Sequence, residues 1–351
     1  MTAAKKKNSR RKQARFRSSR RKRIRNTVLL LFLLVVLGGT GIGAIYVLRN
    51  GTVFDKLEEA YVASREFSGG ITDLDSLRTD GFAKNLCVVV SDVPMDGVSL
   101  GENQKGLLLD LDDRKVLYSK QALQKVYPAS ITKIMTAMLA LKYGNMDDVV
   151  TITQENLNLE EGSQVCGFWA GDQVTLDQLL HCLLVYSGND AAAAIAEHVG
   201  GSTDGFVEMM NSYARELGCT GTHFTNPHGL QDENHYTTPY DIYLMLKEAL
   251  NYPEFTQITQ SGSYTVEYTH ADGSSASTTL LATDHYLTGE ATPPKNVTIL
   301  GGKTGTTDNA GNCLALLSQN AYGKPYISIV MGASTKDELY EQMSSLLQNI
   351  N

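Results

Sequence analysis

The 351-residue sequence has few residues of the kinds that hold small secreted or metal-binding domains together. Its five cysteines are scattered, and no two of them form a C-x-x-C pair. This spacing predicts neither a zinc site nor a disulfide scaffold, although one disulfide bond stays open as an alternative. Cys182 lies in an apolar helical pattern, where we expect core packing. We expect a structural role for Trp169, the single tryptophan, rather than a ligand platform.

Acidic residues are absent from the amino-terminal part of the chain. Residues 1–26 contain 13 Lys/Arg and no Asp/Glu, so the remaining 18 Lys/Arg face all 38 acidic residues in the rest of the chain. A basic tail of this kind could bind nucleic acid. Next to an apolar segment, however, it is better explained as a cytoplasmic tail that sets membrane topology and contacts anionic lipid. We therefore expect no nucleic-acid partner.

Residues 27–48 form a run of 22 residues without a charge, which is long enough to cross a bilayer as a helix. The basic flank predicts a cytoplasmic amino terminus and an extracellular remainder. A cleaved signal peptide is the alternative. The length of the apolar run and the lack of a clear A-x-A site favour an uncleaved, single-pass anchor. The polar residues 49–81 would then be a stalk, and residues 82–351 the globular domain.

The globular part combines early strands, a helical middle, late strands and a closing helix. The stretch 105–120 is typical of a β-hairpin, and the late strand patterns suggest an antiparallel sheet that packs with this hairpin and the last helix. An α+β fold is therefore expected. The helical patterns begin at Ser130, cover 174–186, 189–199, 202–217 and 239–250, and end with a helix from Thr335; the late strand patterns cover 262–268, 274–280, 296–307, 311–319 and 325–332.

A serine and a lysine stand three residues apart in "YPASITKIMTAML", where Ser130 and Lys133 open an apolar helical pattern. Positions i and i+3 share a helix face, so the lysine amine can reach the serine hydroxyl. A serine needs such a base to become a nucleophile, and burial or a nearby cation can lower the pKa of a lysine enough for this role. Alone the motif is weak, because a helix cap followed by a solvated lysine has the same pattern.

A second motif, "YSGND", lies between two helical patterns. There Ser187 could relay a proton and Asn189 could hold a substrate amide. When the motif is taken alone, a plain helix–loop–helix turn with Asn189 or Asp190 as a cap is the better explanation.

The third motif, "GGKTGTT", follows a strand pattern. Lys303 with the hydroxyls of Thr304 and Thr306 could bind a carboxylate, and Gly305 would let a substrate backbone lie against the strand. The spacing G-x-x-x-x-G-K-[ST] of a phosphate loop is absent.

Together and in this order, the three motifs are far more specific than any one of them. Over residues 83–347 the chain resembles the serine D-alanyl-D-alanine carboxypeptidases, which are low-molecular-mass penicillin-binding proteins. Three longer blocks add to the resemblance: "KVLYSKQALQKVYPASITKIMTAMLAL", "GSQVCGFWAGDQVTLDQLLHCLLVYSGNDAAAAIAEHVGGS" and "FTNPHGLQDENHYTTPYDI". The resemblance implies a β-lactamase/DD-peptidase-like fold, an antiparallel sheet flanked by helices with an all-helical subdomain, and makes 82–351 the catalytic domain.

The resemblance also implies a serine acyl-transfer mechanism on peptidoglycan stem peptides that end in D-Ala-D-Ala. Ser130 would attack the terminal peptide bond with Lys133 as its base. Ser187 and Lys303 would pass a proton to the leaving D-alanine, and Asn189 would hold the substrate amide. The reaction needs no metal and no organic cofactor. Penicillins and other β-lactams would acylate the same serine.

The terminal carboxylate would be bound by Thr304 and Thr306, with positive charge from Lys303. The oxyanion hole would consist of the backbone N–H groups of Ser130 and Thr306. Many family members have a histidine where this chain has Thr306, which leaves the pH behaviour and rate open. Many also carry a β-rich second domain and a carboxy-terminal amphipathic anchor. Because the sequence stops soon after the catalytic pattern, we expect neither here and expect the amino-terminal span to be the anchor.

Several alternatives remain open at this point. A DD-transpeptidase differs only in the acceptor, and a penicillin-binding sensor would keep the fold without hydrolysis. A class A β-lactamase uses a glutamate in a loop between the second and third motifs, whereas "ENLN" at 155–158 precedes the second motif. A metal pair of His228 and His235 fits no common spacing, so packing or loop hydrogen bonding is the better explanation. Asp241 is expected to cap or brace the following helix.

Overall fold

We analysed a computed structural model of the chain, which describes residues 85–350. The expected basic tail, membrane-spanning segment and stalk, together with the boundary at residue 82, lie outside these residues. Among the described residues, no helix is long and apolar enough to cross a bilayer.

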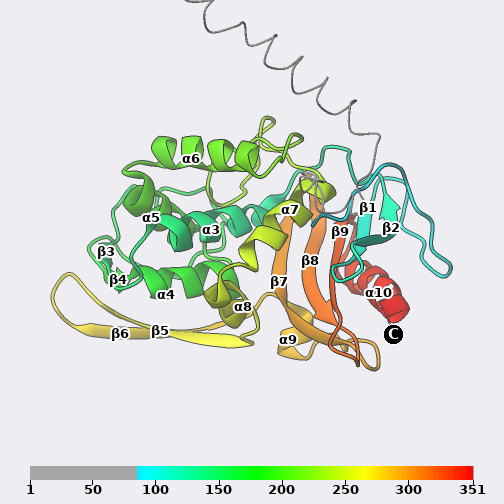
Figure 1. Cartoon of the computed structure of the whole chain (residues 1–351). Coiled ribbons are helices and arrows are strands. Elements are labelled where there is room, and N and C mark those ends of the chain that lie inside the picture. The colour runs from blue at the N-terminus through cyan, green and yellow to red at the C-terminus, as the bar shows by residue number, and fades with distance from the viewer. Residues whose placement is uncertain (1–84, 351) are drawn as a thin grey trace, which may run out of the picture. The chain divides into compact units, whose positions relative to one another are not determined.

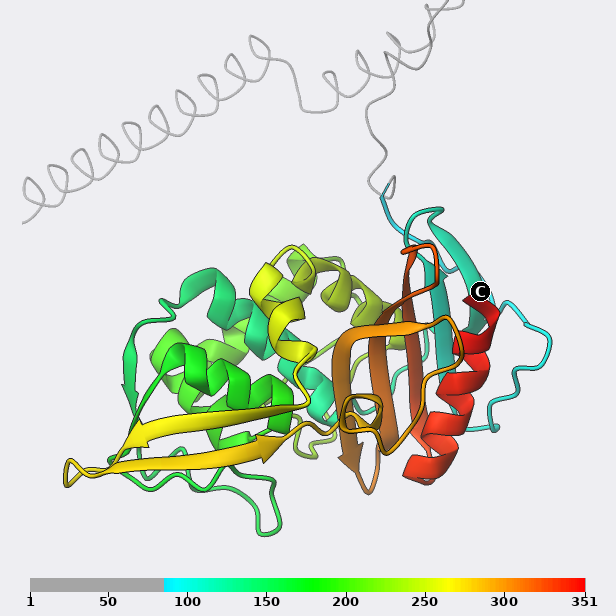
Figure 2. The ribbon, with the colours of Figure 1, turned by 90° about the horizontal axis from the view of Figure 1, so that it is seen from below.

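A five-stranded antiparallel sheet joins the two ends of the described chain. Its strand order is β2-β1-β9-β8-β7, so the expected early hairpin lies beside the late strands (Figure 1). The strands are β1 (Lys105–Asp110), β2 (Lys115–Lys120), β7 (Thr298–Thr307), β8 (Gly311–Gln319) and β9 (Pro325–Ala333). The helix α10 (Lys336–Leu347) covers one face, and the helical part of the domain lies beyond the other (Figure 2). This arrangement confirms the α+β prediction.

The buried residues of the sheet alternate between two cores. Leu107, Leu109 and Ile329 contribute to the core shared with the helices, whereas Leu108 and Val330 pack against α10. Because successive side chains of a strand point to opposite faces, continuous apolar runs are the expected signature of a sheet that is covered on both sides.

The helical part packs around α3 (Lys133–Tyr143), all of whose residues from Lys133 to Ala140 are buried. The alanine-rich α5 lets neighbouring helices approach closely, since its side chains are small. The remaining helices and turns are α4 (Leu176–His181), α5 (Asn189–Gly200), α6 (Thr203–Glu216), α7 (Pro239–Ala249), α8 (Pro253–Thr259), α9 (His285–Thr288) and the short carboxy-terminal turn Gln348–Ile350. The sequence reasoning missed α8 and α9.

Two late strands do not join the main sheet, which corrects the expectation of one late sheet. The strands β5 (Ser263–Thr269) and β6 (Ser275–Leu281) form a second sheet with β3 (Val149–Thr151) and β4 (Gln173–Thr175). Most side chains of β5 and β6 are exposed or half-buried, with Val266 and Leu280 the buried exceptions. The main sheet is covered on both faces. A hairpin that buries so few side chains would gain little free energy by joining it.

Most expected helix ends are confirmed, with two refinements. Thr175 begins α4 with a full capping box, but the predicted helix 174–186 continues from α4 as a π-helical turn, Cys182–Tyr186. Thr335 caps α10 through the N–H of Glu338. The carboxylate of Glu338 accepts from the N–H of Ser334, one residue before the cap. A capping box would return that bond to the cap residue itself.

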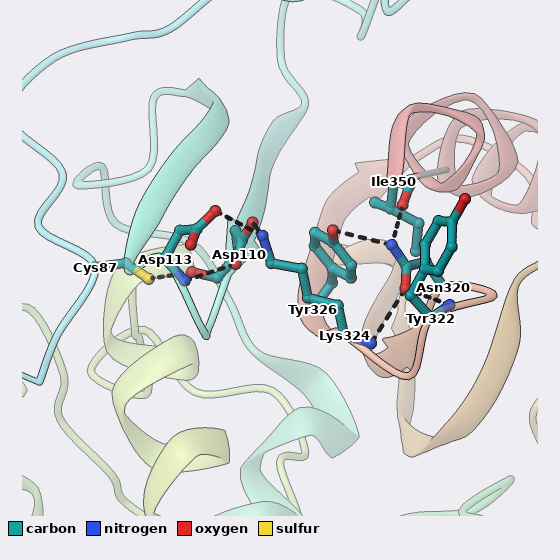
Figure 3. Close-up of polar contacts among 8 residues, drawn as sticks. All are labelled: Cys87, Asp110, Asp113, Asn320, Tyr322, Lys324, Tyr326 and Ile350. Atoms are coloured by element: carbon teal, nitrogen blue, oxygen red, sulfur yellow. Dashed lines mark hydrogen bonds and ion pairs between the residues drawn. The ribbon is translucent and has the colours of Figure 1, made fainter.

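A network of polar contacts lies at the end of the sheet where the β1–β2 and β8–β9 turns meet (Figure 3). Lys324 lies 2.6 Å from both Asp110 and Asp113. In the same turn, Asn320 donates to the backbone oxygen of Ile350 at 3.0 Å. The network therefore joins the first hairpin, the last hairpin and the carboxy-terminal turn.

All five cysteines are free and buried, so the described residues contain no disulfide bond. The side chain of Cys182 is fully buried, as expected of a core residue.

Candidate active site

Ser130 lies in a tight turn rather than in the α-helix that the sequence predicted. A 3₁₀ turn covers Ala129–Thr132, and α3 begins at Lys133. Side chains three residues apart eclipse each other in a 3₁₀ turn. Accordingly, the Lys133 Nζ atom lies 2.9 Å from the Ser130 Oγ atom. Ala129 has a φ of 46°, a left-handed conformation that costs a non-glycine residue about 1 kcal/mol or more.

Lys133 is buried among polar partners instead of facing water. Besides Ser130, its Nζ atom contacts the Asn189 Oδ1 atom at 2.6 Å and the backbone oxygen of His228 at 2.8 Å. Burial, and secondly the charge of Lys303, hold the pKa of Lys133 well below the usual value for lysine. The first and second motifs therefore meet at one amine, which is consistent with a general base.

The second motif is placed by an irregular helix end. The π-helical turn ends at Ser187, whose φ of 70° is left-handed, and Asn189 begins α5. π-Turns often occur at functional sites. A side chain at Gly188 would collide with the sulfur of Cys166, because a Cβ atom there would lie 2.3 Å from it. Three backbone N–H groups donate to the buried carboxylate of Asp190, which fixes the loop.

The third motif is the second half of strand β7. Lys303 is 2 % exposed, its Nζ atom donates to the backbone oxygen of Thr304, and burial lowers its pKa to about 7. The nearby carboxylate of Asp284 opposes this shift. The Thr304 and Thr283 hydroxyl oxygens lie 2.5 Å apart, and the Thr306 hydroxyl donates to the Asn312 side chain at 3.1 Å.

Gly305 makes room for the turn that carries Ser130, which the sequence did not predict. A Cβ atom at Gly305 would lie 3.0 Å from both the Pro128 oxygen and the Ser130 nitrogen. That Gly305 also lets a substrate backbone lie against the strand stays a prediction. The close neighbours in the structure belong to the chain itself, so the glycine lets β7 lie against the turn that carries Ser130.

A cleft of about 320 Å³ brings the motifs together. Of the predicted site residues, Ser130, Ser187, Asn189, Thr304, Gly305 and Thr306 line it, while Lys133 and Lys303 lie buried behind. Two larger hollows of about 640 and 670 Å³ contain none of these eight residues. Sequence reasoning missed the lining residues Gln164, Thr283, Asn312, Lys336 and Tyr340, since none belongs to a short motif.

The remaining candidates have structural contacts. His235 is 1 % exposed, and its ring nitrogens contact Thr132 and the backbone N–H of Thr225. His228 accepts the N–H of Leu230 through Nδ1, so both histidines make loop hydrogen bonds. The carboxylate of Asp241 braces α7 against the preceding loop by accepting from Gly221 and Thr222.

Glu155 does not line the cleft, which agrees with treating "ENLN" as a coincidence. Trp169 is 67 % exposed and stacks on His270, with ring centroids 4.8 Å apart. This high exposure is not that of a core residue, so its structural role is limited to the stacking contact.

The sequence profile of the peptidase S11 family, described as D-alanyl-D-alanine carboxypeptidase, matches residues 101–335. The chain belongs to this family. It is 36 % identical over 251 residues to the D-alanyl-D-alanine carboxypeptidase DacF of Bacillus subtilis, covering 70 % of this chain and 61 % of DacF. It is 33 % identical over 253 residues to DacC of Escherichia coli, covering 69 % and 59 %. The chain thus spans about three fifths of the length of these relatives.

Solved structures of a DD-transpeptidase and a D-alanyl-D-alanine carboxypeptidase are similar to about three quarters of the chain. The Streptomyces K15 DD-transpeptidase has a TM-score of 0.65 and 27 % identity, with 74 % of this chain and 98 % of that chain covered. The D-alanyl-D-alanine carboxypeptidase from Mycobacterium tuberculosis H37Rv has a TM-score of 0.63 and 28 % identity, with 73 % and 92 % covered. The DD-peptidase fold predicted from the three motifs is therefore confirmed.

Proposed function

We propose that this S11 protein is a serine D-Ala-D-Ala carboxypeptidase that removes the terminal D-alanine from peptidoglycan stem peptides. The observation that carries the proposal is the 2.9 Å contact between the Ser130 hydroxyl and a buried lysine amine whose pKa is strongly lowered. This pair supplies a nucleophile and its base. The family and its named relatives support the choice of substrate.

The contacts of Lys133 suit a neutral amine that removes a proton from Ser130. A neutral amine has two N–H bonds and one lone pair. The Asn189 Oδ1 atom and the His228 oxygen can accept the two N–H bonds, which leaves the lone pair for the Ser130 hydroxyl. Attack on the substrate carbonyl then places negative charge on its oxygen, which the backbone N–H groups of Ser130 and Thr306 would stabilise.

Proton transfer to the leaving D-alanine is assigned to Ser187, with Lys303 behind it. A lysine whose pKa is about 7 is partly protonated at neutral pH, so it can supply a proton, which in this proposal passes through the Ser187 hydroxyl. The side-chain nitrogen of Asn189 would hold the substrate amide, since its oxygen is bound to Lys133. The hydroxyls of Thr304 and Thr306 would bind the terminal carboxylate. Water then releases the acyl group from Ser130.

The proposal also includes the location of the protein at the cell membrane. Residues 27–48 would anchor the protein by a single pass, with a cytoplasmic amino terminus and an extracellular catalytic domain. Penicillins would acylate Ser130 as substrate mimics. A DD-transpeptidase is the second candidate, because the K15 enzyme with that name has the same fold.

The test is D-alanine release from a diacyl-Lys-D-Ala-D-Ala peptide by the purified chain and its Ser130→Ala variant. We expect release by the wild type and a loss of about a thousandfold or more in the variant. A folded wild type that releases no D-alanine would refute hydrolysis. Adding an amine acceptor separates transfer from hydrolysis. Labelled penicillin bound without turnover would indicate a sensor, and rapid penicillin hydrolysis a β-lactamase.

A further inference from the structure

Trp169, the single tryptophan of the chain, presents its ring to solvent instead of to the core. The residue is 67 % exposed, and its ring stacks on that of His270 with the planes 20° from parallel. Tryptophan has a large apolar surface, and leaving it in water forgoes the stabilisation that burial would give. Because His270 covers one face of the ring, the opposite face is open to a ligand.

One buried carboxylate holds both members of this stack in place. Asp172 is 1 % exposed, its Oδ2 atom accepts the backbone N–H of Trp169 at 2.8 Å, and its Oδ1 atom lies 2.7 Å from the His270 Nδ1 atom. The ring of Tyr268 lies edge-on against His270, with centroids 5.4 Å apart. A ring that is fixed before binding loses little conformational freedom when a ligand covers it.

The hollow of about 640 Å³ on the second sheet lies beside this stack, because Tyr268 both contacts His270 and lines the hollow. Among the described residues that line it, Glu267 is the one with a charged side chain. Within the same part of the chain, the side chains of Gln173 and Thr269 make no hydrogen bond, so they are available to a ligand. The hydroxyl and amide residues of the lining are Gln173, Thr175, Gln178, Thr269, Ser275 and Ser277.

An open aromatic face beside an uncharged hydroxyl and amide surface suits a carbohydrate. The C–H face of a sugar ring is apolar and packs on an aromatic ring, while its hydroxyl and acetamido groups need hydrogen-bond donors and acceptors. A phosphate or another anion would find no cation in this lining. The surface therefore favours a neutral sugar over a charged ligand.

The stack lies within reach of a substrate that occupies the active-site cleft. Gln164 lines the cleft, and Trp169 follows five residues later, which is at most about 18 Å of chain. The backbone N–H groups of Cys166 and Gly167 hold the intervening loop to Asp190. In a stem pentapeptide, four residues join the glycan strand to the scissile bond, a span of at most about 14 Å. A glycan strand whose stem peptide is bound in the cleft can therefore reach the ring.

We propose that Trp169 and the hollow beside it bind the glycan strand of peptidoglycan, with an N-acetylhexosamine ring stacked on the open face of the tryptophan. Gln173 and Thr269 would bond to the hydroxyl and acetamido groups. This gives Trp169 the ligand-platform role that its sequence context did not favour. The inference goes beyond the proposed reaction but takes its substrate from it. The glycan contact would raise the affinity for attached stem peptides and would take no part in the chemistry at Ser130.

The first test uses the emission of Trp169, which is the one tryptophan in the chain and so reports on the site directly. The purified Ser130→Ala chain is titrated with a soluble tetramer of N-acetylglucosamine, a neutral model of the glycan. We expect a saturable change of the emission. Gln173→Ala keeps the reporter and should weaken binding of the tetramer roughly fivefold.

The second test compares two substrates, a stem pentapeptide that carries its N-acetylglucosamine–N-acetylmuramic acid disaccharide and the same pentapeptide without sugar. We expect Trp169→Ala to lower kcat/KM roughly fivefold for the disaccharide substrate and to leave the sugar-free peptide within about twofold. Trp169→Tyr keeps an aromatic ring and should keep most of the preference. Tyr322→Ala is the matched control, because Tyr322 is a 91 % exposed aromatic residue on the β8–β9 turn, and it should change neither rate.

The two tests separate this proposal from the proposed reaction. An emission that does not change with the tetramer would refute the glycan site, whether or not the peptides are hydrolysed. Equal losses for the two substrates in Trp169→Ala would indicate a structural effect and overturn it, as would no loss for either. Saturable binding of the tetramer by a chain that hydrolyses neither substrate would support the glycan site and refute the reaction alone.

Discussion

Protonation of His235 should destabilise the turn that carries Ser130, because a chain of hydrogen bonds joins this histidine to the turn. Its Nδ1 atom accepts the backbone N–H of Thr225 at 3.0 Å, so in the neutral ring the proton lies on Nε2. The Nε2 atom is 2.8 Å from the Thr132 hydroxyl, which donates to the backbone oxygen of Ala129 beside Ser130. A second proton, on Nδ1, would face the N–H of Thr225 and break this chain of bonds.

Burial is the main cause that lowers the pKa of His235, to about 4. An unfolded chain has the ordinary value of about 6.5. Between pH 6.5 and pH 4 the unfolded state therefore binds a proton that the folded state does not bind. The free energy of unfolding falls as the pH falls. For this single group, the loss relative to pH 7.5 is about 2 kcal/mol at pH 5 and about 3 kcal/mol at pH 4.

The assay is urea unfolding of the wild type and His235→Asn at pH 7.5 and pH 5. At pH 7.5 the variant should be less stable by about 1–3 kcal/mol, because it loses buried hydrogen bonds. Between the two pH values, however, the wild type should lose about 2 kcal/mol more than the variant, since only the wild type has this titrating group. His228, whose pKa is also low at about 3, remains in both proteins and cancels in the comparison. Equal losses in the two proteins would refute the reasoning.

Three further predictions concern the groups around the cleft. Replacing Asp284 by Asn removes the anion that supports the charge of Lys303, so the pKa of Lys303 should fall and the alkaline limb of the kcat/KM profile, near pH 7, should move to lower pH. In Gly229→Ala, a Cβ atom would lie 1.9 Å from the Ala129 oxygen at a φ of +90°, so penicillin acylation should slow by about a hundredfold. Asp190→Asn places an amide among three N–H donors and should cost about 1–3 kcal/mol in urea unfolding.

Each of these predictions has a control or a contrary result. An alkaline limb unchanged in Asp284→Asn would show that Lys303 does not set it. Gly273→Ala has a similar positive φ of 84° with no atom within 4 Å of the new Cβ, so it should lose stability but keep the acylation rate. Equal rates in the two glycine variants would contradict the clash at Gly229. Unchanged stability in Asp190→Asn would mean that the loop finds other acceptors.

Local patterns in the sequence predicted most of the elements and motifs that carry the site residues. The hairpin over 105–120 and the three motifs depend on neighbouring residues, and the structure brings the motifs to one cleft. The separation of β5 and β6 from the main sheet was not predictable in this way. Their patterns resemble those of the other late strands, and only the partner layers decide which strands join.

Two site features depend on contacts between distant segments. One is the close approach of Gly305 to the turn that carries Ser130, because the sequence does not show that these two segments are neighbours. Lys336 belongs to no motif and appears as an ordinary first-turn residue of a surface helix. It lines the cleft only because β9 pairs with β8, and this pairing places the start of α10 beside the cleft.

The pairing of β1 with β9 constrains when the cleft can form during synthesis of the chain. These are the first and last strands of the described domain, with Lys105 opposite Met331. Until the last strand has been made, β1 and β8 each leave a hydrogen-bonding edge without this partner, and such distant pairings form slowly. The cleft and the two buried lysines behind it are therefore completed only after β9 has been made. A growing chain therefore has all three motifs before it has the cleft that brings them together.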